Sequence, residues 1–244
     1  MTETGGNNPA WFQDWANEYD NTLGKVTRHH SLLDLVVRLS GVKKDDHILD
    51  IGCGTGLLSL KFLDTSDCRV TAIDSSARML KLFEEKIEKF NLSDKIQCSQ
   101  KSAEEMDFDP CRFDIVASTV ALHHVRFKEP VIKNIFSSLK DGGRFVLGEM
   151  DLDTTGRPDD PRRLLRILKY LTKEYALALE DGGIPAFERM YDNGKKHILN
   201  DGEYCIGMDQ WAGLCRDAGF RKVNISPVKG FEWFKVLVAV KHPG

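Results

Sequence analysis

The run from Leu49 to Gly56 constrains the possible folds more than any other part of the chain. It reads Leu-Asp-Ile-Gly-Cys-Gly-Thr-Gly, follows a charged turn, and leads into an apolar stretch that begins at Leu57. This pattern predicts a short buried strand, a glycine turn and the start of a helix. The three glycines allow the backbone to turn sharply and to approach a ligand closely, because no Cβ intervenes.

A second strand-like run, residues 69–73, ends at Asp74, which lies 18 positions after Gly56. A carboxylate at that place can hold a ribose diol, as in dinucleotide-binding folds. The glycine spacing, however, is G-x-G-x-G and not the G-x-G-x-x-G of a dinucleotide site. Asp50, two residues ahead of the first glycine, would repel a pyrophosphate but suits a ligand that carries an ammonium group. The sequence therefore predicts a nucleoside-containing cofactor that lacks a pyrophosphate.

Strand and helix patterns alternate after residue 40, which predicts a mainly parallel sheet covered by helices on both faces. A helix after Asp74 carries Met79, Phe83, Ile87 and Phe90 on one face. Another is expected over residues 129–140, and a last one is expected to be capped by Asp209. The expected strands are 47–51, 69–73, 95–99, 113–118, 144–149, 221–226 and 234–240, the last two forming an antiparallel hairpin.

Residues 151–207 interrupt the alternation with a helix over 161–179 and then an irregular stretch rich in glycine and aromatic residues. The segment leaves the carboxyl end of the fifth strand, the edge at which open α/β sheets bind ligands. We interpret it as a cover for the substrate, because so long a connection in a compact domain is usually a lid or binding insertion. The chain is expected to form one domain, with an N-terminal helical cap (1–40), a cofactor-binding core (41–150), the insertion (151–207) and a final helix and hairpin (208–244).

Composition excludes several classes of protein. The chain has 244 residues and a net charge of −3, which argues against a nucleic-acid-binding surface, and the basic stretch 157–169 is interpreted as a solvated helix face. No apolar run approaches the ~20 residues that span a bilayer, and the polar N-terminus lacks a signal-peptide pattern. The sequence therefore predicts a cytoplasmic protein without membrane or nucleic-acid partners.

Cysteines and histidines give no metal-site pattern. The six cysteines are scattered without a C-x-x-C pair, which favours a reducing compartment and neither zinc nor disulfides. Two histidine pairs, His29-His30 and His123-His124, are adjacent in sequence, and adjacent side chains are expected to point in different directions. We therefore expect no metal ion.

The acid followed by G-x-G-x-G resembles the first motif of the class I S-adenosylmethionine-dependent methyltransferases. Residues 113–125 are very similar to a stretch of the small-molecule enzymes of the ubiquinone-biosynthesis type, in which the residues after the strand line the methionine end of the cofactor. The resemblance is strong over about residues 11–150 and loose over 208–240. It implies a Rossmann-like, doubly wound sheet of seven strands with the last antiparallel.

The resemblance further implies S-adenosyl-L-methionine as cofactor, S-adenosyl-L-homocysteine as product, and in-line transfer of the methyl group to a small molecule. Tyr19 matches a tyrosine that lies over the methionine part of the cofactor, where an aromatic face can hold a sulfonium cation. The cofactor-binding residues implied are Tyr19, Asp50, Gly52, Cys53, Gly54, Gly56, Asp74, Ser75, Ser102, Ala103, Glu104, Ser118 and Thr119.

The adenine-binding stretch departs from the family's pattern. Ser102 stands where an acid is common, and it can accept a hydrogen bond from the adenine amino group or simply cap a helix. The motifs of nucleic-acid methylation, an Asn/Asp-Pro-Pro-aromatic run or a cysteine after a proline, are missing after the fourth strand. Both absences favour a small-molecule acceptor.

Candidate catalytic residues are His124, Glu149, Tyr191 and His197. Whether a base is needed depends on the acceptor, because a phenol or an activated carbon must lose a proton whereas a carboxylate or thiolate need not. Three alternatives remain: a non-catalytic subunit that binds S-adenosylmethionine, a protein that uses S-adenosylmethionine for a different reaction on the same fold, and, less favoured by the glycine spacing, a nicotinamide-dependent oxidoreductase.

Overall fold

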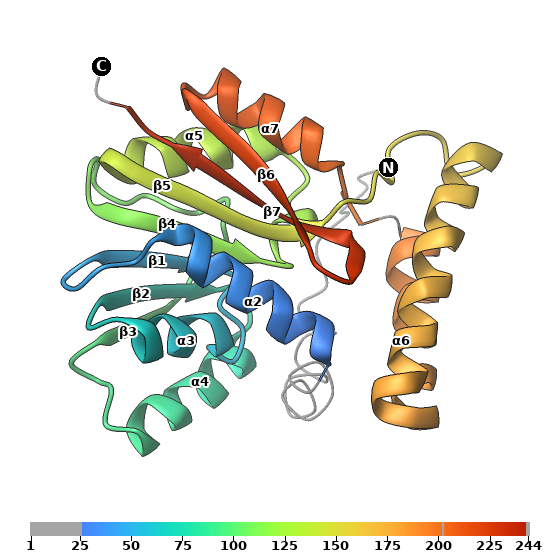
Figure 1. Cartoon of the computed structure of the whole chain (residues 1–244), viewed down its shortest axis with the longest axis horizontal. Coiled ribbons are helices and arrows are strands. Elements are labelled where there is room, and N and C mark those ends of the chain that lie inside the picture. The colour runs from blue at the N-terminus through green and yellow to red at the C-terminus, as the bar shows by residue number, and fades with distance from the viewer. Residues whose placement is uncertain (1–25, 202, 243–244) are drawn as a thin grey trace, which may run out of the picture.

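The computed structural model describes residues 26–201 and 203–242, which form a seven-stranded sheet of order β3-β2-β1-β4-β5-β7-β6 (Figure 1). Strands β1 to β5 pair in parallel, whereas β7 is antiparallel to both β5 and β6. The strands are β1 (His47–Ile51), β2 (Arg69–Asp74), β3 (Ile96–Gln100), β4 (Phe113–Thr119), β5 (Leu139–Met150), β6 (Lys222–Val228) and β7 (Phe231–Val240). The predicted fold class is confirmed.

Helices cover both faces of the sheet, each with an apolar stripe. One core cluster gathers buried side chains of α2, α3 and α4, and the other gathers those of α5 and α7. The helices are α2 (Thr27–Ser40), α3 (Leu57–Thr65), α4 (Ala77–Lys89), η2 (Leu122–His124), α5 (Lys128–Ser138), α6 (Pro161–Asn193), η3 (Gly194–Asp201) and α7 (Met208–Asp217). No helix in residues 26–201 and 203–242 is both long and apolar enough to cross a membrane.

Most of the predicted strand and helix ends differ from the observed ones, and the differences at β5, α5 and α7 bear on the turns between elements. The fifth strand begins at Leu139 and not at residue 144, because residues 141–143, which lie between the predicted helix and the predicted strand, are already part of β5. The helix predicted over 129–140 accordingly ends at Ser138. The last helix is capped by Gly207, and Asp209 lies in its first turn, where its charge still favours the helix dipole.

The insertion is more helical than predicted. Residues 182–204 were expected to be irregular, but α6 continues to Asn193 and the π-helix η3 follows it directly. Gly183 adopts φ 66° and ψ −162°, so the chain breaks there, and Pro185 then stands at the start of a new helical stretch, where its missing N–H costs nothing. Figure 1 shows α6 beside the sheet, next to the edge at which β5 ends.

Gly56 joins the glycine turn to α3 and packs against α4. Its φ is 86°, and a Cβ at this position would overlap the fully buried ring of Phe83. Gly56→Ala is therefore expected to lower the free energy of unfolding by roughly 2 kcal/mol more than Gly142→Ala, measured by urea denaturation. Gly142 is a matched control, because its φ is 79° but a Cβ there meets nothing within 4 Å. Equal losses in the two variants would show that Phe83 does not constrain the turn.

Candidate functional site

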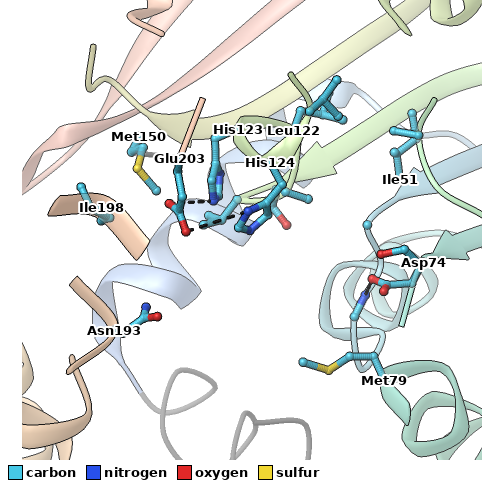
Figure 2. A pocket seen from close by; sticks show the side chains of 18 of the residues that line it. Ile51, Asp74, Met79, Leu122, His123, His124, Met150, Asn193, Ile198 and Glu203 are labelled. Atoms are coloured by element: carbon cyan, nitrogen blue, oxygen red, sulfur yellow. Dashed lines mark hydrogen bonds and ion pairs between the residues drawn. The ribbon is translucent and has the colours of Figure 1, made fainter. Parts of the chain in front are cut away.

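A cavity of about 400 Å³ lies at the carboxyl ends of the parallel strands (Figure 2). The last residues of four strands line it: Ile51 of β1, Asp74 of β2, Thr119 of β4 and Met150 of β5. The opposite wall comes from α2, from α6, from η3 and from Glu203, which lies two positions after the end of η3. The cavity thus lies between the sheet and the insertion, where the sequence predicted a covered site.

Asp74 lies in the part of the cavity that is lined by the glycine turn, Gly52 and Gly54, which we call the glycine half. Its Oδ2 accepts a hydrogen bond from the Gly54 N–H at 2.8 Å, and its Oδ1 accepts one from the Ser76 N–H at 2.8 Å. Burial raises the pKa of Asp74, and these two backbone hydrogen bonds oppose the rise. The carboxylate therefore fixes the glycine turn and also lines the cavity.

Asp50 lies beneath the glycine turn and is not among the residues that line the cavity. It is fully buried, and its Oδ2 accepts a hydrogen bond from the Ser59 hydroxyl at 2.6 Å. Burial raises its pKa from 3.8 to about 7, since the hydrogen bond from Ser59 compensates only in part. The carboxyl is thus placed to support the turn and does not contact the cavity directly.

The raised pKa of Asp50 predicts a pH-dependent stability. The unfolded carboxyl ionises near 3.8 and the folded one near 7, so rising pH destabilises the folded protein across this interval, and the cost is complete above it. Asp50→Asn removes this cost. The stability gain of the variant over wild type is expected to grow by about 2–3 kcal/mol between about pH 5 and about pH 8 in urea denaturation. A gain that does not change with pH would mean that Asp50 ionises normally.

The structure separates the other predicted cofactor residues into two groups. Gly52, Ser75, Ser102, Ala103, Glu104 and Thr119 line the cavity together with Gly54 and Asp74. Cys53, Gly56 and Ser118 do not. The N–H of Cys53 donates to the Ile73 carbonyl at 3.0 Å, and the Ser118 hydroxyl donates to the Ile51 carbonyl at 2.8 Å, so both tie the turn to the sheet. Tyr19 lies outside the described residues.

Ser102 is in a turn and not at the start of a helix, so the helix-capping alternative does not apply to it. Its N–H donates to Glu105 Oε2 at 3.0 Å, which closes the turn on itself. Ser102, Ala103 and Glu104 consequently face the cavity from the loop that follows β3.

Across the cavity from Asp74 lie His123, His124 and Glu203 (Figure 2), and together with Glu149, which contacts His123, they form a group that we call the His–Glu cluster. His123 Nδ1 donates to Glu149 Oε2 at 3.0 Å, and its Nε2 lies 3.5 Å from Glu203 Oε2. His124 Nδ1 lies 3.9 Å from Glu203 Oε1. The expectation that the adjacent histidines point apart is wrong, because the tight 3-10 turn of η2 brings both rings to Glu203 with their centroids 4.0 Å apart.

The cluster is largely buried and strongly charged. The side chains of His123, Glu149 and Glu203 are only 4%, 1% and 11% exposed. Burial lowers the pKa of His123, but the carboxylates of Glu149 and Glu203 outweigh it and raise the pKa above its ordinary value. Sequence reasoning singled out His124 and Glu149 but missed His123 and Glu203. The adjacency of His123 to His124 was the one available signal.

The wall beneath α6 combines charged and aromatic side chains. Arg28 Nη2 lies 3.1 Å from Glu174 Oε2, and its guanidinium lies 4.2 Å from the ring centre of Phe234. Arg28 Nε and Asn193 Oδ1 are buried polar atoms without a hydrogen-bond partner among the described residues. This wall can therefore still offer a ligand one donor and one acceptor.

The other two predicted catalytic residues are not brought into this site. Tyr191 is 45% exposed and does not line the cavity. Its ring packs against Tyr175 and Phe187, with centroids 5.5 and 6.1 Å away. His197 belongs to η3, and its side chain is outside what the structure describes.

Comparison with known proteins agrees with this geometry. Residues 48–143 match the family model described as "Methyltransferase domain". The chain is 27% identical over 177 residues to 27-O-demethylrifamycin SV methyltransferase of Amycolatopsis mediterranei, which covers 70% of this chain and 64% of the relative. It is 31% identical over 147 residues to the ubiquinone/menaquinone biosynthesis C-methyltransferase UbiE of Pseudomonas savastanoi, which covers 59% of this chain and 57% of the relative. The chain thus spans less than two thirds of the length of these curated relatives.

Solved structures share the fold at low sequence identity. A putative S-adenosylmethionine-dependent methyltransferase of Methanococcus maripaludis has a TM-score of 0.66 and 17% identity, covering 100% of this chain and 98% of that one. Phosphoethanolamine N-methyltransferase 2 of Haemonchus contortus has a TM-score of 0.65 and 15% identity, covering 98% of this chain and 61% of that one. The chain therefore contains a methyltransferase domain over residues 48–143, and it shares its fold with S-adenosylmethionine-dependent methyltransferases.

Proposed function

We propose that the chain binds S-adenosylmethionine in the glycine half of the cavity and methylates a small molecule held in the half beneath α6. The observation that carries the proposal is the placement of Asp74, whose half-buried carboxylate lines the cavity at the end of β2 and fixes the Gly54 N–H beside it. That arrangement suits a ribose diol next to a closely approaching backbone. In this proposal residues 41–150 are the cofactor-binding core and residues 151–207 cover the acceptor.

Different residues of the glycine half are placed to bind different parts of S-adenosylmethionine. Asp74 is placed to accept hydrogen bonds from the ribose hydroxyls, and Ser102 and Ala103 to contact the adenine from the loop after β3. Gly52 and Thr119, at the ends of β1 and β4, lie nearer the centre of the sheet, where the methionine part would extend. Asp50, Cys53, Gly56 and Ser118 support these residues without contacting the ligand.

The acceptor half favours a small ligand with an apolar body and a polar group. Tyr170, Met150, Ile198 and Phe234 line it, and Arg28 contributes its unpaired Nε. A total volume near 400 Å³ lies within the roughly 300–1,000 Å³ range of small-molecule sites. Similarity to methyltransferases of rifamycin SV and of ubiquinone or menaquinone biosynthesis supports the same class of acceptor.

The chain would promote transfer chiefly by alignment and by excluding water. When bound, S-adenosylmethionine supplies a methyl group activated on a sulfonium sulfur. Holding the acceptor in line with that methyl group can contribute up to ~7–11 kcal/mol. In this proposal His123, His124 and Glu203 of the His–Glu cluster face the acceptor, and Glu149 of β5 fixes the ring of His123. His124, which is 25% exposed and lines the cavity, is the member placed to contact the acceptor.

The test is release of S-adenosylhomocysteine in the presence of a panel of small phenols, alcohols, carboxylic acids and carbon acids. We expect turnover with at least one class, reduced about 100-fold or more in His124→Ala. His30→Ala is the control, because His30 is an exposed histidine of α2 and does not line the cavity. A chain that binds S-adenosylhomocysteine but turns over no class of acceptor would favour the non-catalytic alternative.

A further inference from the structure

The His–Glu cluster combines features of a metal site that the expected activity does not require. One nitrogen of His123, one of His124 and one carboxylate oxygen of Glu203 all lie within 4.8 Å of one another. Ligand atoms held ~2.1 Å from a common zinc ion in a tetrahedron are about 3.4 Å apart. His123 Nε2 lies 3.5 Å from Glu203 Oε2, and His124 Nδ1 lies 3.9 Å from Glu203 Oε1, so each nitrogen is already close to that spacing from one oxygen of the same carboxylate.

The fourth member of the cluster, Glu149, lies where a residue that hydrogen-bonds a metal ligand, without binding the metal itself, is usually found. Glu149 is 1% exposed, and its Oε2 accepts from His123 Nδ1 at 3.0 Å, which leaves Nε2 as the nitrogen that faces Glu203. The other oxygen of Glu149 accepts from the Met150 N–H at 3.0 Å, so the carboxylate is itself held in place. Histidine ligands of metals almost always donate their second N–H to such a carboxylate, which fixes the tautomer and the ring.

The chemical types of the three ligand atoms also indicate which metal ion the site suits. Two imidazole nitrogens and one carboxylate oxygen suit zinc and neighbouring first-row metals, whereas magnesium and calcium prefer oxygen ligands alone. Two carboxylates, Glu149 and Glu203, supply the charge that a divalent ion balances. Three protein ligands are the number found in catalytic zinc sites, in which a further position stays open.

From this geometry we infer that His123, His124 and Glu203 form a binding site for a divalent first-row transition metal, with an open position that faces the acceptor half of the cavity. All three ligands line the cavity, and Met150 and Ile198 lie beside them (Figure 2). The open position would take an oxygen of the acceptor, so the inference narrows the acceptor of the proposed function to an oxygen-bearing molecule. Only the statement about an oxygen-bearing acceptor rests on the proposed function, and the metal site itself does not depend on it.

The experiment uses the full chain, freed of metal by a chelator and titrated with Co²⁺, whose visible absorption intensifies on tetrahedral nitrogen and oxygen ligation. We expect one Co²⁺ per chain, displaced by Zn²⁺. Glu149→Gln is expected to bind about 10- to 100-fold more weakly, and His124→Ala and Glu203→Gln at least about 100-fold more weakly. Glu203→Gln keeps the shape of the side chain, which guards against a folding defect in His124→Ala.

Two controls exclude other ligands. His30→Ala removes an exposed histidine, and Cys111→Ser removes an exposed thiol, so neither should change the titration. An unchanged Co²⁺ spectrum, or equal affinity in wild type and in both ligand variants, would overturn the inference. Calorimetry with S-adenosylhomocysteine separates it from the proposed function. Cofactor binding without Co²⁺ binding refutes only the metal site, and Co²⁺ binding without cofactor binding refutes only the proposed function.

Discussion

The Asp74→Ala variant is expected to bind S-adenosylmethionine at least about 100-fold more weakly than wild type, because two kinds of interaction are lost together. The ribose hydroxyls lose a charged acceptor, and a hydrogen bond to a charged group contributes about 1.5–3 kcal/mol. The N–H groups of Gly54 and Ser76 lose the oxygens that hold them at 2.8 Å, so the turn is no longer fixed for the ligand. Isothermal titration calorimetry measures both affinities.

Asp94→Ala is a matched control for this loss, since it removes an exposed carboxylate that does not line the cavity. Its affinity should equal that of wild type. Urea denaturation of both variants shows whether the Asp74 variant is folded under the conditions of the titration. A folded Asp74→Ala chain that keeps wild-type affinity would refute the assignment of this carboxylate to the ribose.

The second large effect is expected at the ion pair that joins α2 to the insertion. Arg28 and Glu174 have side chains only 6% and 4% exposed, so Glu174→Ala leaves an uncompensated buried guanidinium. Removing one partner of a buried pair typically costs roughly 3–5 kcal/mol. We expect a loss of this size in urea denaturation, together with faster proteolysis within α6, because the contact anchors α6 over the cavity.

Two further variants isolate the cause of that loss. Arg28→Leu combined with Glu174→Leu replaces the pair by apolar side chains and is expected to recover most of the stability. Asp159→Ala breaks the Arg157–Asp159 pair, whose side chains are 83% and 70% exposed, and is expected to cost about 1 kcal/mol or less. If Glu174→Ala cost no more than Asp159→Ala, the buried pair would not anchor the insertion.

The strands of the sheet could be predicted from the sequence because they are short and buried and because turn residues bound them at both ends. The strand predicted at residues 47–51 has the observed bounds of β1, and the glycine turn and Asp74 then place the cavity at the ends of β1 and β2. The spacing of apolar residues and the turn residues between elements indicate the strands and their ends from local sequence alone, so a single sequence suffices to predict them. The doubly wound sheet of seven strands with the last antiparallel, by contrast, was implied by the resemblance to a family, and the order of the strands was observed only in the structure.

The insertion and the His–Glu cluster could not be predicted in the same way. Gly182-Gly183-Ile184-Pro185 predicts the end of a helix, yet only Gly183 leaves the helical conformation and the helical stretch resumes after it. Glu203 is 80 positions from His123 in sequence, and no local pattern indicates that the insertion returns it to η2. Contacts of this kind depend on how α6 and η3 pack, which a residue pattern does not encode.

Calorimetric titration of the wild-type chain with S-adenosylhomocysteine, with NAD as the comparison ligand, tests the central claim most directly. The cavity, the glycine turn and Asp74 predict tight binding of S-adenosylhomocysteine, with one site per chain, and none of NAD, whose pyrophosphate requires a different glycine spacing. A folded chain that binds NAD, or that binds neither ligand, would contradict the account.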